Sequence, residues 1–147
     1  MNDLFEYLPL AASIGGKIFA VHGGIGNKIN RISDIDSLQR PIIIPREITS
    51  QEHQIIMDLL WSEPKNSDED VTMTHSERDP DGTMNIQSFG PTRLEKFLKQ
   101  NDFSIVIRSH DISQHGFQEF ANRQLISLNS CTNYCGKCEN SACFFVV

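Results

Sequence analysis

The sequence lacks any apolar run that approaches the roughly 18–20 residues a membrane span needs. It also lacks an excess of basic residues, since thirteen Lys and Arg stand against nineteen Asp and Glu in 147 residues. The resulting formal charge of −6 argues against a nucleic-acid backbone as the main partner, because phosphate contacts depend on clustered Lys and Arg. We therefore expect no nucleic-acid partner and no membrane partner.

Cysteine is also scarce, with four residues that all lie between Cys131 and Cys143. The first ten residues contain Asp3 and Glu6 but no basic residue, which is not typical of a secretory signal peptide. We therefore expect an intracellular protein with reduced thiols. Cys135 and Cys138 have the spacing of half a zinc knuckle, so a zinc-binding module remains an alternative to four packed thiols.

Apolar periodicity and turn residues predict one domain of the α/β class. We expect a helix over residues 50–61, capped by Ser50, and another over residues 33–38, capped by Ser33. Residues 142–147 alternate as a final strand that would bury Cys143. The remaining expected elements are helices at 2–7 and 91–101, strands at 10–14, 17–22, 103–107, 117–120 and 124–128, and a surface loop at 63–85.

Two histidines occupy equivalent places in this pattern. His22 follows the apolar run that ends at Val21, and His110 follows the run that ends at Ile107. Strand ends are where ligands bind in α/β sheets, and imidazole is a common metal ligand. The pair is either two metal ligands or two hydrogen-bonded histidines at loop entries. Two imidazoles alone are too few for a hydrolytic metal site.

Two loop residues are further candidates for binding a phosphorylated ligand. Arg78 lies in the long polar segment, where it is either a solvated charge or a two-pronged phosphate clamp. Tyr134 lies between Asn133 and Cys135, where it either packs or presents its hydroxyl to a ligand.

Five ordered motifs then point to a known family. They are Leu8-Pro9-Leu10-Ala11-Ala12, Lys17-Ile18-Phe19-Ala20-Val21-His22-Gly23-Gly24, Asp58-Leu59-Leu60-Trp61-Ser62-Glu63-Pro64, Arg108-Ser109-His110 and Thr132-Asn133-Tyr134-Cys135-Gly136. The series resembles the C-terminal half of the metallophosphoesterase-type serine/threonine protein phosphatases, the group of protein phosphatase 1 and calcineurin. The segments at residues 22–30, 38–42 and 89–91 look most like the branch that carries Kelch repeats.

The resemblance implies a partial calcineurin-like metallophosphoesterase β-sandwich with flanking helices over residues 1–147. It implies two divalent metal ions (manganese, iron or zinc) in the complete enzyme, with His22 and His110 as metal ligands. Arg78 and Tyr134 would contact the substrate phosphate, and Arg108 would support the site. The implied partners are phosphoprotein substrates and regulatory subunits, in the cytoplasm or the nucleus.

The sequence also departs from the family pattern. Its Gly-Asp-x-His-Gly, Gly-Asp-x-Val-Asp-Arg-Gly and Gly-Asn-His-Glu motifs, which supply the other ligands and the acid histidine, do not occur here. Glu63 stands where the family usually has Asp, and Ser109 where it usually has Ala. We therefore expect a C-terminal fragment of a phosphatase that has no activity by itself. The alternative is a non-catalytic remnant that acts as a binding module.

Overall fold

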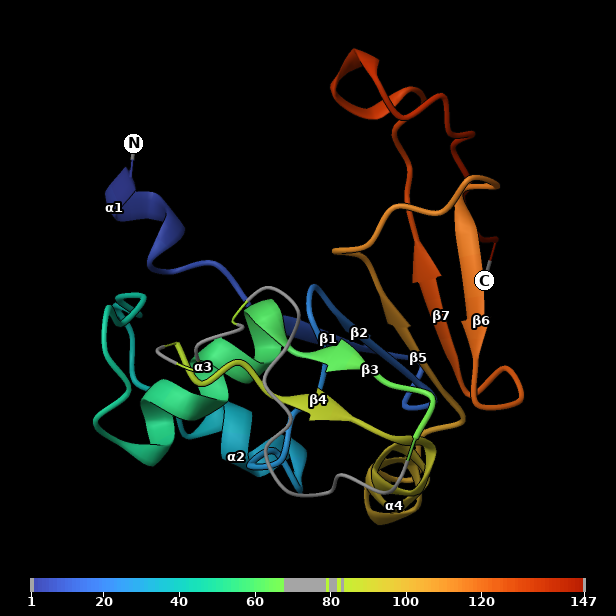
Figure 1. Ribbon diagram of the computed structural model, residues 1–147. Helices are drawn as coiled ribbons and strands as arrows, with labels where there is room; N and C mark the ends of the chain where they lie inside the picture. The colour runs from blue at the N-terminus through green and yellow to red at the C-terminus, as the bar shows by residue number, and fades with distance from the viewer. Residues whose placement is uncertain (1, 68–78, 80–81, 83, 147) are drawn as a thin grey trace.

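The computed structural model describes residues 2–67, 79, 82 and 84–146 (Figure 1). It forms a mixed α/β fold, as the periodicity predicts. The regular elements are α1 (Asn2–Phe5), β1 (Ala11–Ile14), β2 (Ile18–Val21), α2 (Ile32–Asp36), α3 (Gln51–Trp61), β3 (Glu63–Pro64), β4 (Ser88–Phe89), α4 (Pro91–Asn101), β5 (Ile105–Arg108), β6 (Phe117–Phe120), β7 (Leu125–Leu128) and the 3₁₀ turn η1 (Tyr134–Gly136).

A five-stranded sheet with the order β1-β2-β5-β7-β6 forms the centre of the fold. Strand β5 runs parallel to both of its neighbours, whereas β1–β2 and β6–β7 are antiparallel hairpins. Both hairpins are confirmed predictions. The first reverses at Gly15 and Gly16, whose positive φ angles suit the tight connection between the paired residues Ile14 and Ile18.

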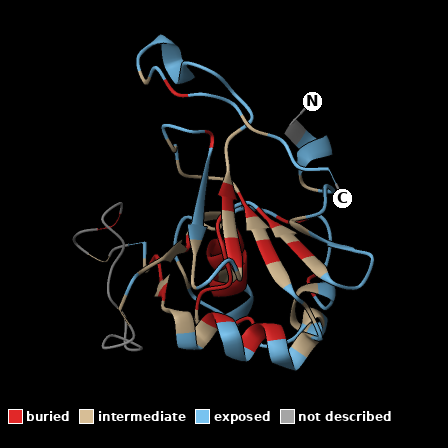
Figure 2. Cartoon of the chain, turned by 90° about the vertical axis from the view of Figure 1, so that its right-hand side faces the viewer, coloured by how far each residue is buried: buried red, intermediate tan, exposed pale blue. Residues whose placement is uncertain are grey.

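The core lies where the sheet meets helices α3 and α4. Phe19 of β2 contacts Phe97 of α4 with ring centroids 5.1 Å apart, and both side chains are buried. Helix α4 begins with Pro91 at its first position, where the missing N–H costs nothing, and it ends at Asp102 in the left-handed conformation. Figure 2 shows the buried residues gathered between the strands and the helices, while the C-terminal loop above them is exposed.

Helix α3 confirms its predicted start, and α2 does not. The Ser50 hydroxyl accepts a hydrogen bond from the His53 N–H at 3.1 Å and so caps α3. Ser33 lies inside α2, whose N-cap is Arg31. The Asp34 carboxylate accepts hydrogen bonds from the backbone N–H groups of Asn30 and Arg31 at 2.8 and 2.9 Å, so it forms part of a capping box in which Arg31 is the N-cap residue.

Two further predictions of local structure are wrong. Residues 142–146 form no strand, and the side chains of Phe144 and Val146 are 79% and 90% exposed. Cys143 is only partly buried, because the segment pairs with no strand of the described chain and a β pattern needs a partner edge. The expected loop at 63–85 starts with a strand instead, since β3 pairs in parallel with β4.

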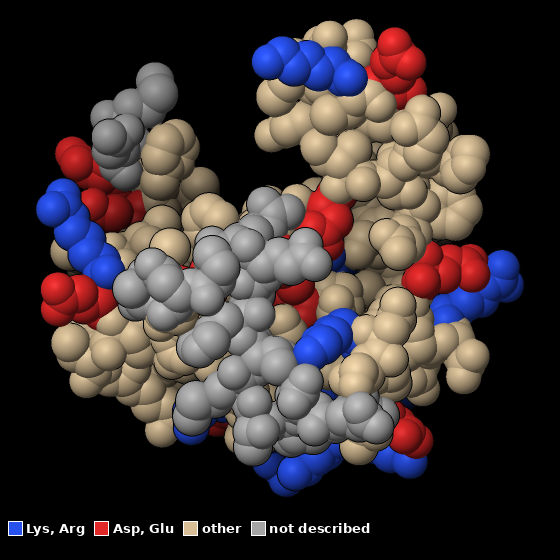
Figure 3. Space-filling view, in the orientation of Figure 1, with Lys and Arg blue, Asp and Glu red and all other residues tan. Residues whose placement is uncertain are grey.

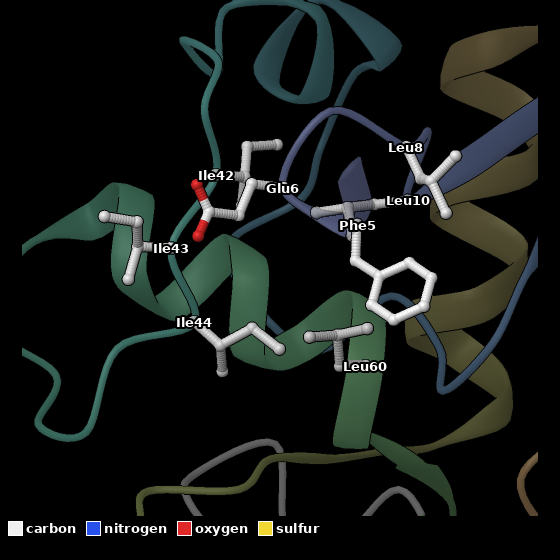
Figure 4. Close-up of a pocket in the computed structure, with 8 residues that line it drawn as sticks. All are labelled: Phe5, Glu6, Leu8, Leu10, Ile42, Ile43, Ile44 and Leu60. Carbon is white, nitrogen blue, oxygen red and sulfur yellow. The ribbon is translucent and has the colours of Figure 1, made fainter. Parts of the chain in front are cut away.

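An apolar groove of about 430 Å³ opens beside α1 (Figure 4). Its walls come from the N-terminal segment, the 42–44 segment and the end of α3, and Glu6 is the charged residue among them. Within the described ranges, no helix is long and apolar enough to cross a bilayer. Figure 3 shows a hollow between the N-terminal segment and the C-terminal loop, with charges of both signs spread over the surface around it.

Candidate functional site

The rings of His22 and His110 meet at one edge of the central sheet. His110 Nδ1 lies 3.1 Å from His22 Nε2, and the ring planes are nearly perpendicular. His22 directly follows β2, and His110 comes two residues after β5. Because β2 and β5 are adjacent and parallel, their carboxyl ends share one edge, and the Ser109 N–H donates to the His22 carbonyl at 3.1 Å. The expected approach of the two rings is therefore observed, while their role as metal ligands stays a prediction.

Arg108 contacts both of the loops that carry His22 and His110. Its guanidinium is buried and donates to the Gly23 carbonyl, to the Asp111 carboxylate and, at 3.0 Å, to the Ser127 hydroxyl. These partners lie in the loop after β2, in the loop after β5 and on β7. One side chain thus fixes both loops relative to the sheet, which fits the supporting role expected for Arg108.

The backbone of His110 is in a conformation that side chains other than glycine rarely adopt, with φ at 74°. The ring itself is well enclosed, with 6% of its side-chain surface exposed. Trp61 at the end of α3 contacts it edge-on, with ring centroids 5.4 Å apart. A strained residue held in place by its surroundings is typical of functional sites.

Glu63 is a site residue that the sequence noted only as a departure from the family pattern. Its Oε1 lies 3.8 Å from His110 Nε2, and its side chain is 17% exposed. Glu63 lies near the histidine because β3 begins two residues after Trp61, the last residue of α3, which also contacts the His110 ring. No sequence signal pointed to this contact, since it depends on a two-residue strand.

A cavity of about 520 Å³ lies over the histidine pair. Tyr134 lines it together with His22, Ser109, His110, Asp111, Ile112 and Asn129. The loop that carries Tyr134 is organised by the buried Asn140, whose side-chain amide donates to the Cys131 carbonyl at 2.7 Å and accepts from the Tyr134 N–H at 2.9 Å. Tyr134 is thus at the same edge as the histidines. Arg78, the other predicted phosphate contact, lies outside the described residues.

The loop after the histidine–glycine turn is held by Asp58 of α3. The Asp58 carboxylate is buried and accepts hydrogen bonds from the N–H groups of Asn27 and Lys28 and from the Gln54 amide. Gly26 passes so close that an added Cβ would lie 2.0 Å from the carboxylate carbon. Burial raises the pKa of Asp58 from 3.8 to about 6, against the opposing effects of these hydrogen bonds and of Arg93.

This pKa predicts how stability depends on pH. Because the folded chain holds the Asp58 proton more tightly than the unfolded chain does, the free energy of unfolding should fall as pH rises from about 4 to about 6, and then level off. Urea unfolding at pH 4.5 and 7 should show this component, about 2 kcal/mol, in the wild type and not in Asp58→Asn. The matched control Asp102→Asn, at a side chain that is 89% exposed, should keep the wild-type slope. Equal slopes in all three proteins would contradict the assignment.

The four thiols are not gathered in the arrangement that the alternative zinc module needs. All are free thiols, and Cys131 and Cys135 are exposed. Among the described residues, no group of three or more His, Cys, Asp or Glu side chains is placed to hold a metal ion. A tetrahedral thiolate site needs sulfur atoms that converge, and these four do not converge.

Comparisons with known proteins agree with this geometry. Residues 1–114 match the family described as calcineurin-like phosphoesterase. The whole chain is 40% identical to serine/threonine-protein phosphatase BSL2 of Arabidopsis thaliana, and it spans 14% of that protein. A solved Saccharomyces cerevisiae serine/threonine phosphatase with similarity to human phosphatase PP5 superposes with a TM-score of 0.76 and 29% identity, over 92% of this chain and 38% of that one. This chain therefore belongs to the calcineurin-like phosphoesterase family.

Proposed function

We propose that residues 1–147 form the C-terminal part of the catalytic domain of a metal-dependent protein serine/threonine phosphatase. Its substrates would be phosphoproteins, and its partners would include regulatory subunits. The observation that carries the proposal is the 3.1 Å approach of His22 and His110 at the edge of the sheet. The names of the two similar phosphatases support the reaction class. Four free thiols support a reducing compartment, the cytoplasm or the nucleus.

The residues present fit a divalent cation. Two imidazole nitrogens from separate strands face each other, and neutral imidazole is a ligand for manganese, iron and zinc alike. Two ligands do not complete a site, so the remaining ones would come from the part of the catalytic domain that these residues do not include. When bound, a pair of divalent cations supplies Lewis-acid activation of water and of the phosphoryl oxygens.

The chain's own residues would hold the cation, position the loops that carry its ligands and bind the substrate phosphate. His22 and His110 would hold one cation at the sheet edge. Arg108 holds their two loops in a fixed position relative to each other. Tyr134 lines the cavity above the histidines, where its hydroxyl would meet the substrate phosphate. Arg78 would add charge to the same phosphate.

A graft tests this proposal. The corresponding segment of Arabidopsis BSL2 would be replaced by residues 1–147, and manganese-dependent hydrolysis of a phosphoserine peptide would be measured. The graft should be active, while the 147-residue chain alone should show no turnover near the roughly 1 per second of ordinary enzymes. His22→Ala or His110→Ala in the graft should lower kcat/KM about 100-fold or more, because each removes a metal ligand.

The matched control is His115→Ala, since His115 is an exposed histidine outside the cavity. It should leave the activity of the graft unchanged. A folded graft with no turnover would favour the non-catalytic binding module. Full activity in both histidine variants would refute the metal assignment.

A further inference from the structure

We propose that Glu63 is a positioning residue that holds His110 in its Nε2–H tautomer, so that the Nδ1 lone pair is kept for a divalent cation. This inference rests on the proposed function and adds to it a residue and a role. It starts from the two sides of one ring: Nδ1 of His110 faces His22 Nε2, and Nε2 faces the Glu63 carboxylate.

The surroundings of the ring favour one tautomer. A neutral imidazole carries one N–H, and an ionised carboxylate can only accept. Glu63 Oε1 lies 3.8 Å from Nε2, which is an electrostatic contact and longer than a direct hydrogen bond. Both side chains are largely buried, so the interaction is weakly screened by solvent. Placing the proton on Nε2 is therefore favoured, and Nδ1 becomes the acceptor.

The backbone keeps Glu63 at this distance. The Glu63 N–H donates to the Gln87 carbonyl at 3.2 Å, and Glu63 pairs with Ser88 in the β3–β4 register. Trp61 contacts the His110 ring edge-on. Metal-bound histidines commonly have such a carboxylate on the nitrogen away from the metal, where it fixes the ring and raises its basicity.

The position of the proton between the two histidines follows from the same geometry. With Nδ1 of His110 as acceptor, the proton in the histidine–histidine contact belongs to Nε2 of His22. If both nitrogens held a cation, this hydrogen bond would be lost. His22 would then carry its proton on Nδ1 and offer Nε2 as a ligand, while His110 would keep its tautomer. Glu63 therefore preorganises His110 as a ligand, whereas His22 would have to change its tautomer.

Imidazole NMR tests the tautomer directly. The 147-residue chain with ¹⁵N-labelled histidine would be examined by two-bond ¹H–¹⁵N correlation, and Zn²⁺ would be titrated into the BSL2 graft described above, which supplies the remaining ligands. The wild type should show His110 as the Nε2–H form. Glu63→Ala should show a mixture of tautomers and about a tenfold weaker Zn²⁺ affinity. Glu63→Gln, which keeps an acceptor oxygen, should recover most of the tautomer preference.

Glu119→Ala is the matched control, because the substitution removes the same charge at a glutamate that pairs with Arg123 on the β6–β7 hairpin. It should match the wild type in both measurements. An unchanged tautomer and affinity in folded Glu63→Ala would overturn the inference while leaving the metal site intact. If Glu63→Ala does not fold, a mixture of His110 tautomers in the wild type would also overturn the inference. A wild-type graft that binds no Zn²⁺, while the chain shows the Nε2–H form, would count against the proposed function instead.

Discussion

Gly23→Ala should destabilise the chain by roughly 3 kcal/mol or more, enough to leave a large share of it unfolded. The glycine lies directly against the end of α3, where its N–H donates to the Leu59 carbonyl at 2.7 Å. A Cβ there would lie 2.5 Å from the Leu60 carbonyl carbon and 2.6 Å from the Trp61 nitrogen. These are backbone atoms of a helix that is packed into the core, so they cannot rotate away.

Urea unfolding followed by the fluorescence of Trp61, the single tryptophan, measures this loss. The control is Gly15→Ala, since an added Cβ there meets no atom within 4 Å and only the positive φ is unfavourable. It should cost about 1–2 kcal/mol. Similar losses in the two variants would show that the contact with α3 does not matter. Because Gly23 follows His22, the larger loss should also abolish the contact between the histidines.

Arg108→Ala should cost about 3 kcal/mol, because it deletes a buried cation whose partners stay behind. The carbonyl of Gly23 and the hydroxyl of Ser127 would both lose a charged donor. Asp111 is one-third exposed, so water compensates part of its loss. We expect a lower urea midpoint together with broadened or shifted imidazole signals of His22 and His110.

Arg123→Ala is the control for this change. Its side chain is 76% exposed and pairs with Glu119 on a hairpin. Surface ion pairs contribute little, so the expected loss is below about 1 kcal/mol. If Arg108→Ala were as stable as this control, or left both imidazole signals in place, Arg108 would not be the tie between the two loops.

Secondary structure was predicted most accurately where a local signal, such as a helix cap, agrees with the packing of the tertiary fold. Helix α3 has a serine cap and a regular apolar face, and α4 begins at a proline, so both were predicted within a residue. His22 and His110 were placed at one sheet edge because each follows a short apolar strand. The resemblance to the family then implied that these two histidines lie close together.

Two of the failures share one physical cause, which is dependence on a partner that lies far along the chain. The pattern at 142–147 is that of a strand, but no neighbouring strand in the described chain accepts it. Glu63 approaches His110 only because β3 pairs with β4, a contact of two residues on each side. The left-handed backbone of His110 is set by the loop around it and has no signature in composition. The failure at α2 is local: the helix begins after Arg31, and Asp34 accepts a hydrogen bond from the Arg31 N–H, so Ser33 lies inside the helix and not at its N-cap.

The pairing of β2 with β5 also orders events in time. His22 and His110 are separated by 88 residues, and Ile18 pairs with Ile105. At a synthesis rate of about 5–20 residues per second, His22 leaves the ribosome roughly 4–18 seconds before His110. The backbone hydrogen bonds of helices α3 and α4 join residues close in sequence, whereas the histidine pair requires closure of the longest loop in the sheet. The edge that carries both histidines therefore cannot form until the residues up to His110 have been synthesised.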